Sequence, residues 1–403
     1  MLPIIILSFL VRIISLNQSL WLDEAISYSA VRNYNLLDII TKFIPGDVHP
    51  PLYYLVLKLW TDIFGYSEIS LRFPSVIFGV ITVWVVYKIG RKLFDEKTGK
   101  IAALFLALNP LAIYYSQEAR MYSLAMLLVA LSVWMFLEKK KWWFGVFWVA
   151  VIYTDYLPWL MTPVWGVWGV WGVWALPWLP IIWQQLSASA TLAREVPAWG
   201  HVVGGLYLKA ILLVPIKFIF GRISSYWLMA PVILFYGWIM AQARNKFLWF
   251  WLAFPLVAGA IISLKIPIFT YHRFLFVMPA FVILLAAGVK NKKLVTSLIC
   301  LISLMSLMVF NLNQNFWRED WRGAAKYINS NPGKVLMPSS AQSSALVYYH
   351  VNMVEGQSPV YLFRYVQEIF DPEDSLRLKL ENSGYILSEQ KSFTGVVVWK
   401  YLK

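Results

Sequence analysis

Apolar stretches separated by short polar segments make up most of the chain before residue 313. A membrane-crossing helix needs roughly 20 mainly apolar residues. Several of these stretches are a few residues shorter, so we expect the helices to extend slightly beyond them. We predict spans near residues 1–16, 73–90, 101–116, 121–137, 142–157, 226–242, 247–264, 274–289 and 294–312. The pattern therefore predicts an all-α polytopic membrane module over residues 1–312, with roughly 9–11 transmembrane helices.

One stretch does not fit a simple span. No charged residue occurs between Asp155 and Gln184, and tryptophans recur there with a period of three, at positions 165, 168, 171 and 174. On an α-helix that period spreads the four side chains over about half of the circumference. The charges of the flanking loops require zero or two crossings in this stretch. We therefore expect two short or re-entrant helices.

The polar ends of the module indicate two further structures. Residues 51–64 are apolar but short and contain Lys58, which favours an interfacial helix within a large first external loop, 17–72. From residue 313 onward the composition is that of a soluble protein. We expect a small α/β external domain over 313–403, with a helix at Gly323–Asn329 and strands at Val335–Pro338 and Gly395–Tyr401.

Composition and charge support this division and set the orientation. The chain is 60% apolar and only 14% charged, and its net charge is +14. The basic excess lies in short loops of the membrane module, at residues 88–100, 139–141, 244–246 and 290–293. Lys and Arg in short loops mark the cytoplasmic side, so this charge orients a multi-pass cell-membrane protein and does not indicate a nucleic-acid partner. The segments 17–72, 116–121, 186–225, 265–273 and 313–403 then lie outside.

Two adjacent carboxylates, Asp23 and Glu24, follow the first apolar stretch directly. A pair of acids at a membrane surface favours binding or catalysis. The structural alternative is an N-cap for the next helix, but a cap needs one carboxylate and not two.

Other polar groups stand where a membrane protein rarely places them. His49 precedes two prolines that stiffen its loop. Glu118 and Arg120 lie in a turn between two apolar stretches that is too short to extend away from the membrane surface. Arg273, next to His272, lies at the external end of a span, where it favours a phosphate or carboxylate partner. Each group also has a purely structural alternative. His49 would be a solvated histidine in a turn, Glu118 and Arg120 an ordinary ion pair, and Arg273 an arginine that extends to the membrane interface.

Five short motifs occur in order along the chain. They are Trp21-x-Asp23-Glu24-Ala25, His49-Pro50-Pro51-Leu52-Tyr53-Tyr54, Arg72-Phe73-Pro74-Ser75, Gln117-Glu118-Ala119-Arg120-Met121-Tyr122 and Glu319-Asp320-Trp321-Arg322. Together they resemble the polyprenyl-phosphate-sugar-dependent glycosyltransferases of the GT-C fold. Within that superfamily the likeness is to the branch with protein O-mannosyltransferases and lipid A aminoarabinose transferases.

The resemblance implies an inverting transfer of a sugar from a polyprenyl phosphate to an acceptor hydroxyl on a glycan, lipid or protein at the outer face. It implies Asp23 as the base, with Glu24 as its neighbour or alternate and Glu118 as a third acid of the site. The candidates for contacts with the phosphate or the sugar of the donor are His49, Arg120, Tyr122, His272 and Arg273. Asp155 and Tyr53 are additional candidates. Asp155 stands where relatives often carry a histidine after the threonine of Tyr153-Thr154.

The sequence gives no sign of a nucleotide cofactor and leaves two other functions open. The sequence has no phosphate-binding loop or dinucleotide fingerprint, so no nucleotide cofactor is expected. The resemblance implies a possible divalent metal, because the second acidic site of the family is sometimes linked to one; no ligand cluster is evident here, and the metal is left open and unassigned. The single cysteine, Cys300, excludes an internal disulfide. Two other functions remain open: a transporter or flippase of lipid-linked sugars, and a non-catalytic assembly subunit. The sequence names neither the sugar nor the acceptor.

Overall fold

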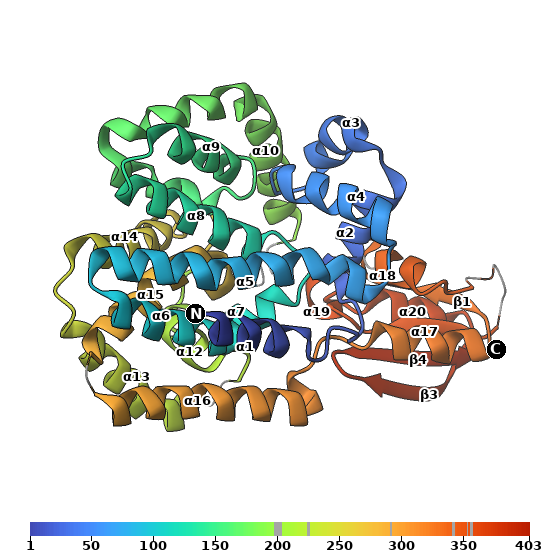
Figure 1. Cartoon of the computed structure of the whole chain (residues 1–403). Coiled ribbons are helices and arrows are strands. Elements are labelled where there is room, and N and C mark those ends of the chain that lie inside the picture. The colour runs from blue at the N-terminus through green and yellow to red at the C-terminus, as the bar shows by residue number, and fades with distance from the viewer. Residues whose placement is uncertain (197–203, 224–225, 291, 341–342, 353, 355–357) are drawn as a thin grey trace.

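The computed structural model describes residues 1–403 except 197–203, 224–225, 291, 341–342, 353 and 355–357. A helical module holds the first three quarters of the chain, and a smaller domain with a sheet lies at one end of it (Figure 1). Helices of the first loop, α2 (Leu22–Asn33), α3 (Leu36–Asp38) and α4 (Leu52–Phe64), lie beside this junction. Between α3 and α4 the chain makes a π-helical and a 3₁₀ turn at Ile39–Phe43 and Ile44–Gly46.

The longest helix, α5 (Glu68–Leu93), runs through the middle of the module. Ser67 caps it, because its side chain accepts a hydrogen bond from the Ser70 N–H at 3.2 Å. Its most extensive packing is against α6 (Glu96–Leu108), α8 (Tyr122–Leu137) and α1 (Leu2–Ile13). At 1.5 Å per residue, its 26 residues reach about 39 Å, enough to cross a bilayer.

The remaining helices of the module pack around these four. They are α7 (Pro110–Ser116), α9 (Lys141–Ile152), α10 (Leu179–Glu195), α12 (Leu208–Phe220), α13 (Tyr226–Ala241), α14 (Lys246–Ile262), α15 (Met278–Gly288) and α16 (Lys293–Leu312). A 3₁₀ turn at Tyr271–Val277 leads into α15, and another at Gln314–Phe316 follows α16.

Among the described residues, three helical segments are long and apolar enough to cross a membrane: Glu68–Leu93, Tyr271–Gly288 and Lys293–Leu312. Five shorter apolar helices accompany them. The mainly helical architecture is thus confirmed, while a total of roughly nine to eleven crossings stays a prediction. Helix α12 packs against α7 and α13, in a segment, 186–225, where we expected only an external loop. Residues 197–203 and 224–225 of that segment lie outside the described residues.

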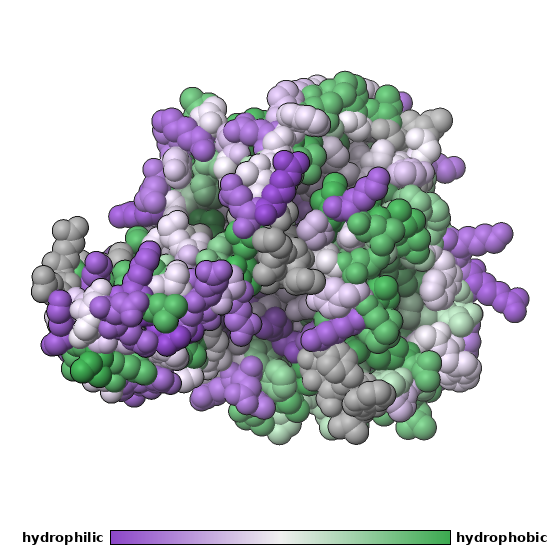
Figure 2. Space-filling model, turned by 180° about the vertical axis from the view of Figure 1, so that it is seen from behind, coloured by the Kyte–Doolittle hydropathy of each residue, from purple (hydrophilic) through white to green (hydrophobic). Residues whose placement is uncertain are grey.

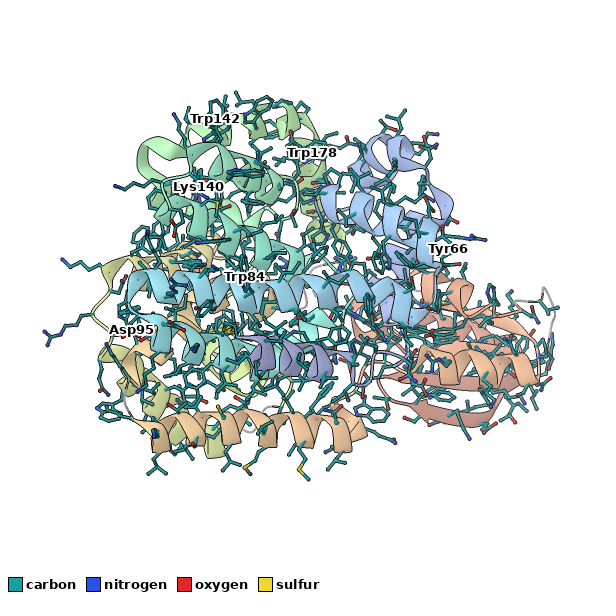
Figure 3. All side chains as sticks on the ribbon, in the orientation of Figure 1. Tyr66, Trp84, Asp95, Lys140, Trp142 and Trp178 are labelled. Carbon is teal, nitrogen blue, oxygen red and sulfur yellow. The ribbon has the colours of Figure 1, made fainter. Side chains whose placement is uncertain are left out.

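The four basic loops meet at one end of the module, as their charge pattern predicts. Lys290 Nζ lies 2.7 Å from Asp95 Oδ2, which joins the loop before α16 to the loop before α6. Lys92 Nζ lies 3.5 Å from Glu138, beside the second basic loop. Lys292 donates to Gln242 at 2.7 Å, two residues from Arg244 of the third. In Figure 3, Asp95 and Lys140 mark this end, and Tyr66 lies at the opposite end.

The tryptophan-rich segment forms 3₁₀ turns over Leu157–Trp178, with a sharp bend at Gly166, whose φ is +54°. Trp165 packs on Phe136 and Phe144 near the basic loops, whereas Trp178 donates to Tyr156 Oη at 3.0 Å, back at the start of the segment. The chain therefore goes out and returns, as expected for two short segments. Our α-helical geometry was wrong: the segment forms 3₁₀ turns, which have three residues per turn and not 3.6.

The C-terminal domain carries a four-stranded sheet in the order β1-β2-β4-β3. Its strands are β1 (Lys334–Leu336), β2 (Val360–Phe363), β3 (Ile386–Phe393) and β4 (Val396–Leu402). β1 pairs with β2 in parallel, and the other two pairs are antiparallel. Its helices are α17 (Trp321–Ser330), α18 (Ser343–Tyr348), α19 (Gln367–Phe370) and α20 (Ser375–Asn382). The predicted helix and both strands are confirmed as α17, β1 and β4.

The first loop and the C-terminal domain share a core. Ala25 of α2 is fully buried in the cluster that contains Trp321, Phe363 and Val398. Leu20 N–H donates to Tyr349 Oη at 2.7 Å, and Tyr348 Oη donates to the Tyr66 carbonyl at 3.1 Å. Hydrophilic side chains dominate the domain's surface, and apolar ones gather over the helical module (Figure 2). The start of α2 is thus held between the two parts.

Candidate active site

The first turn of α2 presents both carboxylates of the Asp23-Glu24 pair. Glu24 is the third residue of the helix, and its Oε2 accepts the Trp21 N–H at 3.4 Å, which is one half of a capping box. Acidic residues are favoured in a first turn by the helix dipole. The N-terminal capping alternative therefore describes part of what Glu24 does.

Glu24 is fully buried and tied to the rest of the module. Arg72 Nε and Nη2 donate to its two oxygens at 2.8 and 2.5 Å, and the Ala119 N–H donates to Oε1 at 2.9 Å. Arg72 also donates to the Leu16, Gln18 and Ser19 carbonyls. Burial acts to raise the pKa of the Glu24 carboxyl, but Arg72 outweighs it and holds that pKa below its ordinary value.

Asp23 differs from its neighbour because solvent reaches it. Its side chain is 34% exposed, whereas those of Glu24 and Glu118 are at most 1% exposed. Asp23 Oδ2 lies 3.8 Å from Arg120 Nη2, a long ion pair that leaves its oxygens accessible. Of these three acids, Asp23 is the one that an incoming hydroxyl can approach.

Arg120 stands at the centre of a polar cluster. Its Nη2 lies 3.3 Å from His49 Nδ1, and its Nη1 donates to Tyr54 Oη at 3.2 Å. Tyr54 in turn donates to Asp47 at 2.6 Å, and His49 Nδ1 lies 3.5 Å from the same carboxylate. Burial acts to raise the pKa of Asp47, yet the His49 charge and hydrogen bond hold it at about 2. The proline-stiffened loop thus brings His49 to Arg120.

Glu118 is a fully buried acid of the same site. Neither of its carboxyl oxygens has a hydrogen-bond partner among the described residues. The nearest cation is Arg318, whose Nη2 lies 4.0 Å from Oε2. Burial raises the pKa of the Glu118 carboxyl to about 8, although Arg318 acts against the rise. Glu118 therefore holds a proton over most of the neutral range.

A layer of rings adjoins Arg120. Tyr122 packs edge-on against His272 with centroids 5.1 Å apart, and His272 stacks on Tyr115 at 5.6 Å. The neighbouring Arg273 side chain is half-buried and has no ion pair among the described residues. The predicted group Tyr122, His272 and Arg273 therefore comes together, beside the turn that carries Glu118 and Arg120.

The two additional candidates lie around this cluster. Tyr53 is buried, with its Oη 3.4 Å from Ser75 Oγ, so it lies behind the site. Asp155 is buried at the end of α9 and accepts the Leu157 N–H at 3.2 Å.

Four residues of the site were not assigned from the sequence: Arg72, Arg318, Arg222 and Glu319. Arg318 lies over the Tyr114 ring at 4.2 Å and Arg222 over the same ring at 5.1 Å. Glu319 is hydrogen-bonded by Trp321 and Tyr365, and burial raises its pKa. Arg72 and Glu319 stood in quoted motifs, which was a usable signal. Arg318 and Arg222 carry no local sequence signal, because only distant contacts identify them.

Metal ligation was left open by the sequence. Within the described part of the chain, no group of three or more His, Cys, Asp or Glu side chains is placed to hold a metal ion. The described residues thus do not fit a divalent-metal site of that kind.

Comparison with known proteins gives matches in family and in fold. Residues 48–156 match the family described as dolichyl-phosphate-mannose-protein mannosyltransferase. The search of curated protein sequences gave no match. ArnT from Cupriavidus metallidurans in the apo state is similar over 99% of this chain and 97% of its own, with a TM-score of 0.60 and 12% identity.

Two more solved structures share the fold. ArnT bound to undecaprenyl phosphate has the same coverage and TM-score, at 13% identity. The Archaeoglobus fulgidus oligosaccharyltransferase tethered to an acceptor peptide matches with a TM-score of 0.52 and 13% identity, over 91% of this chain and 69% of its own. The chain shares its fold with these solved structures, and the family match over residues 48–156 supports the resemblance of the motifs to GT-C fold polyprenyl-phosphate-sugar glycosyltransferases.

Proposed function

We propose that the protein is an inverting glycosyltransferase that moves a sugar from a polyprenyl phosphate to an acceptor hydroxyl at the outer membrane face. The observation that carries the proposal is the accessible Asp23 carboxylate beside the buried Arg120, with the buried Arg318 next to Glu24 and Glu118. Both arginines have N–H groups without a partner among the described residues. The family match over 48–156 and the fold of ArnT support the same kind of reaction.

The chemistry assigns a distinct role to Asp23. An acceptor hydroxyl attacks the anomeric carbon, the bond from that carbon to the phosphate oxygen breaks, and the phosphate leaves with the electron pair. The hydroxyl proton must go to a base, and Asp23 is the exposed acid of the three. Attack from the side opposite the phosphate inverts the anomeric configuration.

The leaving phosphate needs donors, and the site has them. Arg120 Nε and Arg318 Nε and Nη1 are buried N–H groups without a hydrogen-bond partner among the described residues. Buried donors are normally satisfied, so unpaired ones on cations favour an anionic ligand. Arginine suits phosphate because its planar fork can form two parallel hydrogen bonds. Arg120 and Arg318 are therefore our phosphate ligands, with His49 and Arg273 beside them.

The other two acids receive supporting roles. Glu24 has its acceptor positions occupied by Arg72 and the Ala119 N–H, so it positions α2 and does not take a proton from substrate. Protonated Glu118 can donate a hydrogen bond to a sugar hydroxyl or a phosphate oxygen. Tyr122 and His272 offer ring surfaces to the sugar or to the first isoprene unit.

The proposed outer location follows from the basic loops. They meet at the end of the module away from the site, and such loops face the cytoplasm. The site and the C-terminal domain then face outward, where an acceptor is reached without crossing the bilayer.

The test measures release of polyprenyl phosphate from a panel of radiolabelled polyprenyl-phosphate sugars. The full chain is placed in lipid nanodiscs with a membrane acceptor fraction. Wild type is compared with Asp23→Asn and with a control on the same loop, Asp38→Asn, whose carboxylate pairs with Lys42. We expect turnover of at least one donor by wild type and by the control, and its loss in Asp23→Asn.

Equal turnover in wild type and Asp23→Asn would remove Asp23 as the base. Absence of turnover with every donor, together with lipid-linked sugar translocation in liposomes, would establish the transporter in place of the transferase. If neither sugar transfer nor translocation is found, and the protein tolerates every substitution in the site, the assembly subunit is favoured.

A further inference from the structure

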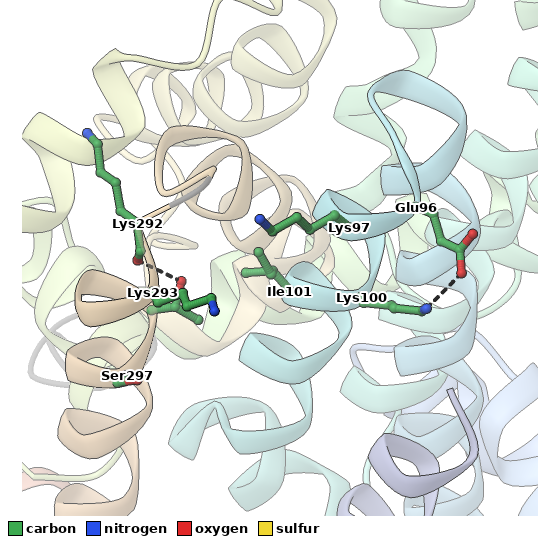
Figure 4. A pocket seen from close by; sticks show the side chains of 8 residues that line it. Glu96, Lys97, Lys100, Ile101, Lys292, Lys293 and Ser297 are labelled. Atoms are coloured by element: carbon green, nitrogen blue, oxygen red, sulfur yellow. Dashed lines mark hydrogen bonds and ion pairs between the residues drawn. The ribbon is translucent and has the colours of Figure 1, made fainter.

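A second charged feature lies at the basic end of the module. An open pocket of about 690 Å³ lies between the first turns of α6 and α16 (Figure 4). Its lining side chains are Glu96, Lys97, Lys100, Ile101, Lys292, Lys293, Thr296 and Ser297.

This pocket is remote from the candidate active site. Arg72, which holds Glu24, lies near the start of α5, and the pocket adjoins the loop after its last residue, Leu93. The 21 residues between them correspond to about 31 Å along the helix axis. The ligand of this pocket therefore cannot be the reacting sugar.

The pocket is strongly basic and its shape is held by contacts. Four lysines line it with one acid, Glu96, which pairs with Lys100 at 2.7 Å. Lys292 is held by Gln242, and the neighbouring Lys290 by Asp95. Lys293 is exposed and has no ion pair among the described residues. Two hydroxyls, those of Thr296 and Ser297, add hydrogen-bonding groups, so an anion finds both charge and donors here.

An apolar stripe begins at the pocket and continues along α16. Large exposed side chains occur at spacings of four and three residues, which places them on one helix face. The ones in line with Ser297 of the pocket are Leu301, Leu304 and Met308, which follow it at steps of four, three and four residues. Only about a fifth of this helix is buried, and it is apolar enough to cross the membrane. Charge at the interface thus continues directly into a lipid-facing surface.

We propose that this pocket binds the phosphate headgroup of an anionic phospholipid from the leaflet at the basic end, with an acyl chain along the α16 stripe. Attraction of Lys and Arg clusters to anionic lipids is general at membrane surfaces. What sets this site apart is the combination of a formed cavity with a contiguous apolar track. A free phosphate ion would use the lysines and leave the stripe without a role.

The test titrates the full-length protein in detergent with phosphatidylglycerol and counts bound lipids by native mass spectrometry. The pocket variant is Lys97→Gln with Lys293→Gln. The matched control is Lys139→Gln with Lys140→Gln, two exposed lysines of another loop at the same end. Each interfacial lysine contributes about fivefold in affinity, so we expect roughly 30-fold weaker binding in the pocket variant. The control should bind as wild type does.

Equal weakening in pocket variant and control would overturn the proposal, because the effect would then be one of overall charge. So would binding of phosphatidylcholine or inorganic phosphate with the affinity of phosphatidylglycerol. The charge-preserving variant Lys97→Arg with Lys293→Arg should restore binding, and its failure to do so would also overturn the proposal. Thermal unfolding without added lipid should be the same for all variants, since these side chains are exposed.

Discussion

Arg72 binds both carboxylate oxygens of Glu24 across 48 positions of sequence, at 2.8 and 2.5 Å. The same guanidinium gathers three backbone carbonyls of the loop before α2. The start of α2 is thereby fixed to the first turns of α5. Because Asp23 precedes Glu24 directly, this ion pair determines where the proposed base stands.

We predict that Glu24→Gln destabilises the fold. The substitution leaves the Arg72 charge buried without its counter-ion, a loss that typically costs about 3–5 kcal/mol. Thermal unfolding of the purified protein in detergent should show a clearly lower midpoint. The control is Glu96→Gln, which removes an exposed ion pair with Lys100 and should leave the midpoint unchanged. Equal midpoints for wild type and Glu24→Gln would show that the pair does not stabilise α2.

Arg120→Lys should weaken donor binding. Lysine keeps the charge but loses the planar fork, and a charge-assisted hydrogen bond contributes about 1.5–3 kcal/mol, or roughly 10- to 150-fold in affinity. Competition against labelled polyprenyl phosphate measures the change. Arg244→Lys, at an exposed basic loop, is the control and should bind as wild type does. Undiminished affinity in Arg120→Lys would assign the phosphate to other cations.

Glu118 should give the native protein a specific pH dependence. Its pKa is raised to about 8 in the fold, so between its ordinary value and about 8 the native state holds a proton that the unfolded chain has released. The free energy of unfolding is then highest at low pH and falls as pH rises through this window. Midpoints measured from pH 5 to 9 should fall more steeply in wild type than in Glu118→Gln. Parallel curves would mean that Glu118 titrates normally.

Much of the fold could be predicted because hydrophobic pattern and charge are local signals. The basic loops predicted one common end, and the Lys290–Asp95 and Lys92–Glu138 contacts bear this out. The tryptophan segment shows the limit of such reasoning. Its period of three fits a 3₁₀ helix, a form that is rare beyond a few residues and that we did not consider.

The candidate site was predictable where one motif carries the chemistry, and less so where partners meet across the chain. Asp23 and Arg120 were singled out because they are charged residues at the edge of apolar stretches. In the structure Asp23 Oδ2 lies 3.8 Å from Arg120 Nη2. Arg318 was not, because it follows α16 in a linker and reaches Glu118 only through the fold. The exposed fraction of the side chain distinguishes Asp23 from Glu24 as the proposed base. The sequence of the motif does not reveal which of two adjacent acids is buried.

The most direct test of the account separates donor binding from chemistry in Asp23→Asn. Single-turnover release of polyprenyl phosphate and the equilibrium affinity for the same donor are measured on wild type and variant in nanodiscs. A lost general base lowers the rate by roughly 10²- to 10⁴-fold, while the arginines that hold the phosphate are unchanged. We predict that loss of rate with donor affinity preserved within about threefold. An unchanged rate, or a loss explained wholly by weaker donor binding, would contradict the assignment of Asp23 as the base.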